Sequence, residues 1–187
     1  HFRRDAIVLP FLPREIQPSA EQLPVRYDYL YVASGEPHKN HRRLLQAWIL
    51  LANHGFLPSL CLTLDTQRDA ALFSWVEQLV RQHSLCVFNN PVPAGQISRL
   101  YAQCGALIYP SLFESFGLPL LEARQAGLPI VAAERDYVRD VVAPVVSFDP
   151  ESALSIARAV MRYQGEAVEP AMPGDAASFL VRLAESG

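Results

Sequence analysis

The chain has 187 residues, of which 50% are hydrophobic and 19% are charged. This composition is typical of a folded globular domain and excludes an intrinsically disordered chain. The formal net charge is −3, and no basic cluster is apparent, so we expect no nucleic-acid partner. No apolar run reaches the length of a membrane span, and no secretory leader is apparent.

The first segment, residues 1–26, is rich in proline and is predicted to be an extended lead-in with one short strand at residues 6–9. From residue 27 onward, apolar runs alternate with segments whose apolar residues recur at helical spacing. Strands are predicted at residues 27–33, 60–64, 85–88, 106–109, 129–133 and 145–148. Helices are predicted at residues 41–53, 69–82, 96–103, 119–126, 136–142, 151–162 and, in the tail, 176–184.

Short apolar strands that alternate with amphipathic helices predict parallel βαβ units. We therefore expect residues 27–187 to form one α/β domain, with a Rossmann-like parallel sheet and helices on both of its faces. Ligands of such sheets bind beside the carboxyl ends of the strands. Function is therefore expected in the loops that follow Ala33, Phe88, Tyr109 and Ala133.

The loop after Tyr109 carries the features that suggest chemistry. Gly117 allows a backbone to approach a ligand closely, and the helix that starts near Pro119 offers free N–H groups for a phosphate. Two carboxylates, Glu114 and Glu122, bracket this site, and sugar or ribose hydroxyls are their natural partners. The same residues are explained equally well by an ordinary surface loop, in which the negative charge of Glu122 is simply favourable near the positive end of a helix.

Residues 110–132 read PSLFESFGLPLLEARQAGLPIVA and resemble the Glu-x7-Glu signature of the retaining, GT-B-type glycosyltransferases of family 4, or group 1. The resemblance implies that Glu114 faces hydroxyls of the donor sugar and that Glu122 holds the ribose hydroxyls. It also implies that backbone amides reach the donor sugar and its diphosphate from Phe116, Gly117 and Leu118. Ser115 stands where the family usually has glycine.

A second match is the segment SGEPHKNH at residues 34–41, which is similar to a segment of the same family that ends in Pro-x-Lys-Asn. A lysine at a positive helix start makes sense if it holds an anion, and the resemblance implies that Lys39 binds the donor diphosphate. Ser34 belongs to the same implied site but stands where many members have arginine. His38 and Arg42 are candidates to supply the positive charge that an arginine at position 34 would provide. The alternative is a solvated lysine at a helix start.

The resemblance extends to two further segments. Residues 89–93 follow a strand where the family places the nucleobase, which implies that Asn90 and Val92 contact the base. Residues 148–150 read FDP and are similar to the family's closing segment. Together the matches span roughly residues 27–163.

No metal or separate cofactor is expected. His38 and His41 lie three residues apart, without acidic or thiol partners at metal-ligand spacing, and no Asp-x-Asp motif is present. Trp48 and Trp75 lie on apolar helix faces and are predicted to be core residues. Reduced, buried thiols are predicted for Cys61, Cys86 and Cys104.

The resemblance implies the C-terminal, donor-binding domain of a glycosyltransferase that transfers a hexose with retention from a nucleotide sugar to an acceptor hydroxyl. Glu114 and Lys39 are the implied catalytic residues. An acceptor glycan or lipid-linked glycan would bind an N-terminal domain absent from this sequence, and residues 1–26 would be the interdomain segment. The expected location is the cytoplasm, either free or in peripheral contact with the inner face of the membrane. Two alternatives stay open: a sugar-nucleotide epimerase on the same scaffold, and a non-catalytic nucleotide-binding module.

Overall fold

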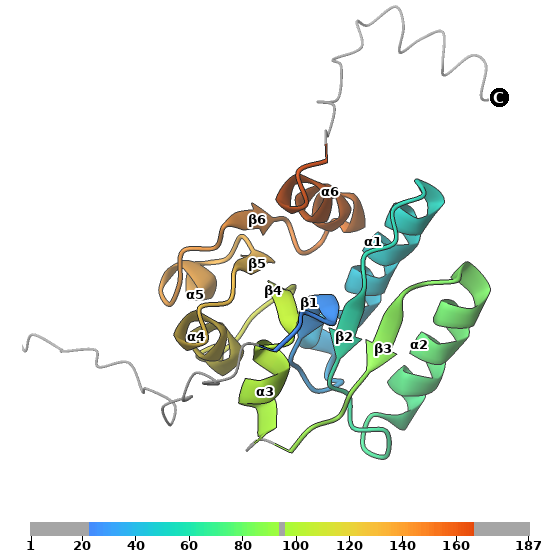
Figure 1. Cartoon of the computed structure of the whole chain (residues 1–187), viewed down its shortest axis with the longest axis horizontal. Helices are drawn as coiled ribbons and strands as arrows, with labels where there is room; N and C mark the ends of the chain where they lie inside the picture. Colours follow the sequence, from blue (N-terminus) through green and yellow to red (C-terminus); the bar gives the residue numbers. More distant parts are fainter. Residues whose placement is uncertain (1–22, 94–95, 167–187) are drawn as a thin grey trace, which may run out of the picture.

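The computed structural model describes residues 23–93 and 96–166 of the chain (Figure 1). Six parallel strands form one sheet in the order β3-β2-β1-β4-β5-β6. Their bounds are β1 Tyr27–Tyr31, β2 Leu60–Leu62, β3 Val87–Asn89, β4 Cys104–Tyr109, β5 Ile130–Ala133 and β6 Val146–Phe148. The central strands β1 and β4 are mostly buried, as expected for strands that helices cover on both sides.

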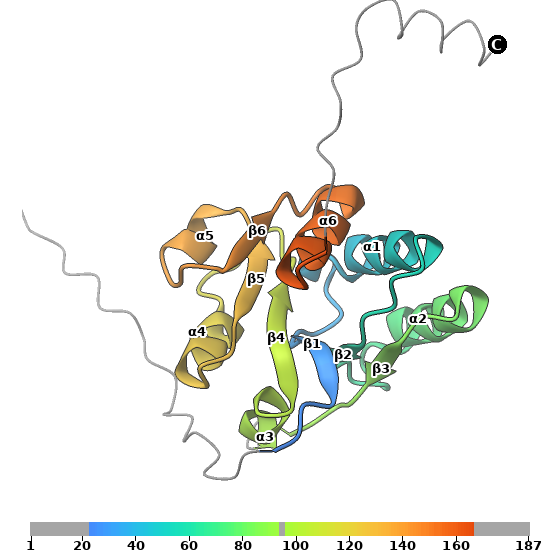
Figure 2. The same cartoon turned by 45° about the horizontal axis from the view of Figure 1, so that its top comes forward.

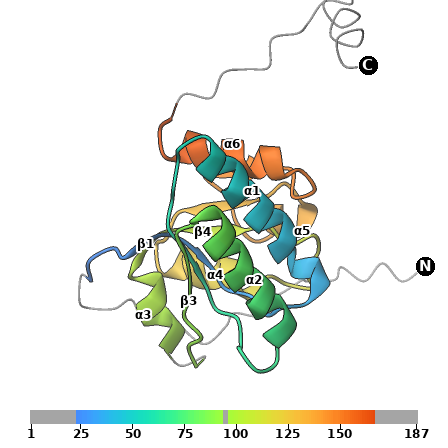
Figure 3. The same cartoon turned by 90° about the vertical axis from the view of Figure 1, so that its right-hand side faces the viewer.

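Helices connect every pair of consecutive strands. They are α1 His41–Asn53, α2 Ala70–His83, α3 Ile97–Tyr101, α4 Leu118–Gln125, α5 Asp136–Arg139 and, after the last strand, α6 Ala153–Tyr163. Figures 1 and 2 show α6, α1 and α2 on one face of the sheet and α3, α4 and α5 on the other. Figure 3 looks at the face that carries α1 and α2. This arrangement confirms the predicted Rossmann-like α/β fold.

Helix α1 shows how the apolar pattern builds this core. Its apolar residues at helical spacing, Leu44, Leu45, Trp48 and Leu51, are each at most 1% exposed. The indole Nε1 of Trp48 donates a hydrogen bond of 2.9 Å to the carbonyl of Pro58, so its polar edge is satisfied inside the core. The chain leaves the helix through Gly55, whose φ of 77° lies in the left-handed region that glycine adopts without strain.

The strand order fixes where a ligand site can form. From β1 the chain winds outward to β2 and β3, and it then crosses back to β4 on the other side of β1. Loops after β1 and β4 therefore diverge from adjacent strands at a topological switch point, where such sheets leave a crevice. These two loops are the ones that carry the candidate residues Lys39 and Glu114.

Most deviations from the predicted elements concern their ends. Strands β1 and β2 are two residues shorter than expected, and a 3-10 helix, η1 Pro37–Lys39, precedes α1. Trp75 is not a core residue, because it is only partly buried and packs under the guanidinium of Arg42, 4.7 Å from its ring centre. The predicted strand at residues 6–9 and helix at residues 176–184 lie outside the described residues.

Candidate functional site

Two adjoining pockets lie at the carboxyl ends of β1 and β4. One has a volume of about 580 Å³ and is lined by Lys39, Tyr109, Glu114, Ser115, Phe116, Gly117, Leu118 and Pro119. The other has a volume of about 570 Å³ and is lined by Ser34, Glu36, His38, Lys39, Phe113, Glu114 and Ser115. Because Lys39, Glu114 and Ser115 belong to both linings, we treat the two pockets as one site, the Lys39–Glu114 pocket.

An ion pair joins the two residues that sequence analysis singled out as catalytic. The ammonium of Lys39 lies 2.8 Å from each carboxylate oxygen of Glu114. Their side chains are 17% and 9% exposed, respectively, so the pair is shielded yet reachable from the pocket. Lys39 is the only lysine in the sequence. Because the ammonium of Lys39 neutralises the carboxylate of Glu114, this carboxylate can lie beside a candidate anion site.

The start of helix α4 forms the floor of this pocket. Gly117 is its N-cap residue, with φ 70° and ψ 51°, a conformation that glycine adopts without the steric cost of a Cβ. A Cβ built there would also lie 3.0 Å from a methyl carbon of Leu120. Pro119 has no N–H, and the N–H of Leu120 donates to the carbonyl of Gly117 at 2.9 Å. No side chain caps this helix start, so its dipole and the N–H groups of Gly117 and Leu118 are what it offers to an anion.

The second carboxylate, Glu122, lies deeper along α4 and is not among the lining residues of the Lys39–Glu114 pocket. The hydroxyl of Tyr101 donates a hydrogen bond of 2.9 Å to Glu122 Oε2. The structure thus places both predicted carboxylates on the same loop and helix start, but only Glu114 lies directly against Lys39. The ribose-binding role of Glu122 stays a prediction.

Of the other residues predicted to contact the diphosphate, some lie at this site and some do not. Ser34 lies in the pocket wall, where its hydroxyl donates to the carboxylate of Glu36. His38 also lines the pocket and stacks on Phe113, with ring centres 4.6 Å apart. Arg42 faces Trp75 instead and does not line this pocket, so it is a poor substitute for the arginine expected at position 34.

The predicted base-contacting residues follow β3. The backbone N–H of Asn90 donates to the carbonyl of Leu62 at 2.8 Å, and this bond fixes the exit of the chain from the strand. Val92 is partly buried against the core. Neither residue lines the Lys39–Glu114 pocket, and residues 94–95 lie outside the described part of the chain. Their contact with a nucleobase stays a prediction.

Sequence analysis missed a set of tyrosines beneath this site. The hydroxyl of Tyr31 donates to the carbonyl of Lys39 at 2.6 Å, and that of Tyr137 donates to the carbonyl of Ser111 at 2.7 Å. The hydroxyl of Tyr109 donates to Glu114 Oε1 at 3.0 Å. Burial raises the pKa of all three tyrosines well above the usual value, so each hydroxyl remains a donor. For Tyr31 and Tyr109 the available signal was their position at the ends of β1 and β4, whereas Tyr137 lies in α5.

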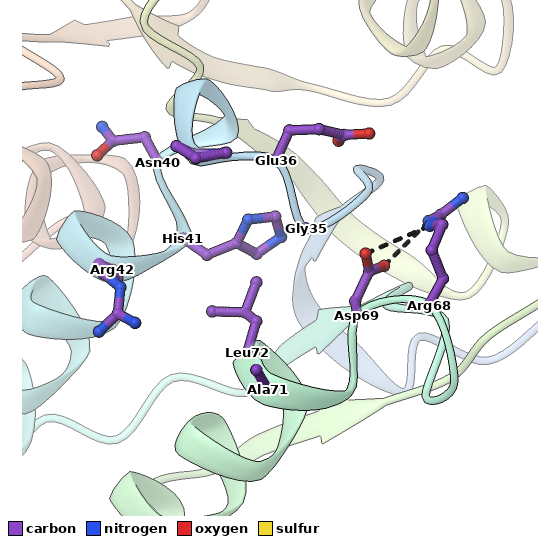
Figure 4. A pocket seen from close by; sticks show the side chains of 10 residues that line it. Gly35, Glu36, Asn40, His41, Arg42, Arg68, Asp69, Ala71 and Leu72 are labelled. Carbon is purple, nitrogen blue, oxygen red and sulfur yellow. Dashed lines mark hydrogen bonds and ion pairs between the residues drawn. The ribbon is translucent and has the colours of Figure 1, made fainter.

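A third pocket, of about 460 Å³, lies between the starts of α1 and α2 (Figure 4). His41 lies in its wall and is 3% exposed, and neither of its ring nitrogens has a hydrogen-bond partner among the described residues. Its ring packs against Tyr31, with centres 4.8 Å apart. Asp69, on the opposite wall, pairs with Arg68 at 2.9 Å. The pocket does not contain Lys39 or Glu114 in its lining.

Burial of His41 should make the stability of the domain depend on pH. Burial lowers the pKa of His41 to about 4, whereas an unfolded histidine has a pKa of about 6.5. The unfolded state therefore binds a proton first, and stability present above pH 6.5 is lost as the pH falls toward 4. Between pH 7.5 and 5 we expect His41 to account for a loss of about 2 kcal/mol in the free energy of unfolding.

Urea unfolding at these two pH values measures this effect. His41→Phe should remove most of the difference, whereas His83→Gln, which alters an exposed histidine, should leave it unchanged. The same pH dependence in His41→Phe and in the natural chain would contradict a neutral, buried His41.

No helix within residues 23–93 and 96–166 is long and apolar enough to cross a lipid bilayer. In the same ranges, no three His, Cys, Asp or Glu side chains come together as metal ligands could.

Comparison with known proteins places this chain in a family. The family model described as glycosyl transferases group 1 matches residues 14–167. The O-antigen chain mannosyltransferase B of Escherichia coli is 34% identical over 142 residues, which cover 71% of this chain and 36% of that protein. A D-inositol 3-phosphate glycosyltransferase of Frankia alni is 42% identical over 60 residues, 32% of this chain and 15% of that protein. The chain thus spans about a third, or less, of the length of these relatives.

Solved structures show the same fold. The C-terminal domain of a glycosyl transferase group 1 family protein from Francisella tularensis superposes with a TM-score of 0.63 at 20% identity, covering 84% of this chain and 85% of that one. The Anabaena protein HepE in complex with UDP and glucose gives a TM-score of 0.61 at 20% identity, covering 73% of this chain and 38% of that one. With the family model matching most of the chain, the protein belongs to the glycosyl transferases group 1 family.

Proposed function

We propose that the chain is the donor-binding domain of a retaining glycosyltransferase, which moves a sugar from a nucleoside diphosphate to an acceptor hydroxyl. The observation that carries this proposal is the Lys39–Glu114 pair in a pocket beside the start of α4. Such a pocket offers a cation and helix amides to a diphosphate, and a carboxylate to sugar hydroxyls. A second, N-terminal domain would supply the acceptor site.

The charges of the pocket suit the chemistry of transfer. Negative charge develops on the leaving diphosphate, where Lys39 and the N–H groups at the start of α4 stabilise it. Glu114 accepts hydrogen bonds from the hydroxyls of the donor sugar and holds its ring in place. Since Lys39 is bonded to Glu114 in this structure, the ammonium has to turn at least partly from the carboxylate toward the phosphates.

The proposed sugar follows from the relatives rather than from the pocket. The Escherichia coli protein that is 34% identical is named as an O-antigen chain mannosyltransferase. We therefore propose mannose as the first sugar to test, and a growing glycan or lipid-linked glycan as the acceptor. The three scattered cysteines are free thiols, which fits a reducing compartment such as the cytoplasm.

Product analysis tests the proposed reaction. The full-length protein that contains this chain is incubated with radiolabelled sugar nucleotides and an acceptor glycan pool. Labelled glycan with the anomeric configuration of the donor supports retaining transfer. Formation of an epimerised sugar nucleotide supports the epimerase instead, and nucleotide binding without any product supports a non-catalytic module.

A substitution at Glu122 tests the predicted ribose contact. If its carboxylate accepts from ribose hydroxyls, Glu122→Ala should weaken the binding of both nucleoside and nucleotide by roughly 10- to 100-fold, because a hydrogen bond to a charged group contributes about 1.5–3 kcal/mol. Calorimetric titration measures both affinities. Glu77→Ala, at an exposed position of α2, is the matched control, and equal affinities in the two variants would remove this role from Glu122.

A further inference from the structure

Each carboxylate of the Glu-x7-Glu segment is held by a tyrosine from outside that segment. Tyr109, the last residue of β4, donates to Glu114 at 3.0 Å. Tyr101, the last residue of α3, donates to Glu122 at 2.9 Å. Both tyrosines are 1% exposed. The two hydroxyls thus approach the carboxylates from the protein interior and leave the remaining oxygen lone pairs for other partners.

The surroundings of Tyr109 prevent its ring from following a moving carboxylate. Its ring packs edge-on against that of Tyr31, with centres 5.8 Å apart, and against that of Tyr137, at 6.5 Å. Tyr31 and Tyr137 are themselves fixed by hydrogen bonds to backbone carbonyls. A ring enclosed in this way keeps its hydroxyl at one point, whereas the long side chain of Lys39 has several rotatable bonds.

This difference matters because Glu114 has two kinds of partner. Lys39 is bonded to both of its oxygens, and Tyr109 is bonded to one of them. When the ammonium turns toward a diphosphate, Glu114 loses its bonds to Lys39 and keeps its bond to Tyr109. Glu122 has a simpler environment, since the Tyr101 hydroxyl is the side-chain partner that the described part of the chain provides.

We propose that Tyr109 and Tyr101 are positioning residues, which hold Glu114 at the donor sugar and Glu122 at the ribose while Lys39 turns from Glu114 to the diphosphate. This inference rests on the proposed function. It goes beyond it by assigning the orientation of each carboxylate to a buried hydroxyl. It also predicts that the two hydroxyls affect different parts of the ligand.

Calorimetry with graded ligands tests this division. The ligands are guanosine, GDP and GDP-mannose, together with uridine, UDP and UDP-glucose. For the base that binds, Tyr109→Phe should weaken binding of the sugar nucleotide by about three- to tenfold, a part of the value of one charged hydrogen bond, and leave the nucleoside and nucleoside diphosphate unchanged. Tyr101→Phe should weaken the binding of all three ligands by a similar factor, because each of them contains the ribose.

Two controls separate positioning from loss of structure. Tyr163→Phe removes a hydroxyl that donates to the carbonyl of Gly105 at 3.2 Å, away from the pocket, and should change no affinity. Incorporation of 4-aminophenylalanine at position 109 restores a donor at the same place on the ring and should recover binding of the sugar nucleotide. Uniform weakening of every ligand by Tyr109→Phe, or failure of this rescue, would overturn the positioning role.

Because Lys39 is the only lysine in the sequence, ¹³C-labelled lysine gives one side-chain spin system by NMR. Its ε-methylene signal should move when GDP or UDP is added, in the natural chain and in both phenylalanine variants. A moving signal with unchanged affinities in both variants would refute the tyrosine roles and leave the proposed function intact. A signal that no nucleotide moves, together with no heat of binding, would refute the proposed function and the tyrosine roles with it.

Discussion

The 187-residue chain is expected to transfer no sugar when it is incubated alone with a sugar nucleotide that it binds and with an acceptor. In the proposed enzyme the acceptor hydroxyl is delivered by a second domain. Without that domain the two substrates meet only by diffusion. Pre-orientation of two substrates lowers an activation barrier by about 7–11 kcal/mol, so its loss slows the reaction by roughly five to eight powers of ten. Slow hydrolysis of the donor is the most that should remain.

The exposure of the pocket adds to this loss. Lys39, which would stabilise the leaving diphosphate, is 17% exposed in the described structure, and the rim residue Phe113 is 63% exposed. Water that reaches the phosphates raises the local dielectric and weakens the electrostatic stabilisation of developing charge. A second domain that closed over this rim would exclude that water.

Chromatography of labelled products measures this expectation. The matched control is the longer chain that includes the second domain, assayed under the same conditions and at the same concentration. Turnover by the 187 residues at a rate close to that of the longer chain would contradict the account, because the acceptor site would then have to lie within this domain.

Lys39→Met is expected to lower affinity for a nucleoside diphosphate by about 10- to 100-fold and to leave affinity for the nucleoside unchanged. Lys39 is the only lysine of the chain. A charge-assisted hydrogen bond from its ammonium to a phosphate contributes about 1.5–3 kcal/mol. The substitution also leaves Glu114, 9% exposed, without its cation. We therefore expect a loss of about 1–3 kcal/mol in the free energy of unfolding as well.

A second substitution separates these two effects. In the double variant Lys39→Met with Glu114→Gln, the buried carboxylate becomes a neutral amide, so most of the lost stability should return, whereas diphosphate affinity should not. Calorimetry and urea unfolding on the same preparations measure both quantities. Equal losses of nucleoside and diphosphate affinity in Lys39→Met would show that the lysine supports the fold of the loop and not an anion.

The fold could be predicted from the sequence because its two periodicities are distinct. Leu44, Trp48 and Leu51 recur on one face of a helix, whereas the β4 residues from Ala106 to Tyr109 form a continuous apolar run, as doubly covered strands do. Element ends were less predictable, because they depend on pairing with neighbouring strands. Strand β1, for example, ends at Tyr31 although apolar residues continue to Ala33.

The site was predictable where one local segment defines it and unpredictable where distant segments meet. The segment around Glu114 and the lysine before α1 were each recognisable, yet their mutual ion pair follows only from β1 and β4 being neighbours. The hydroxyl of Tyr101 reaches Glu122 across 21 positions of sequence, and no local spacing encodes such a contact. The stacking of Arg42 on Trp75 likewise required the packing of α1 against α2.

Thermal unfolding of the chain with UDP, GDP, ADP and their sugar conjugates tests the central claim, that the Lys39–Glu114 pocket binds a nucleoside-diphosphate sugar, most directly. One nucleoside diphosphate and its sugar conjugates, in excess over the Kd by about 100- to 1,000-fold, should stabilise the natural chain by about 3–4 kcal/mol. The same ligands should stabilise the Lys39→Met, Glu114→Gln variant much less. Absence of stabilisation by every nucleotide, or equal stabilisation of both chains, would contradict the account.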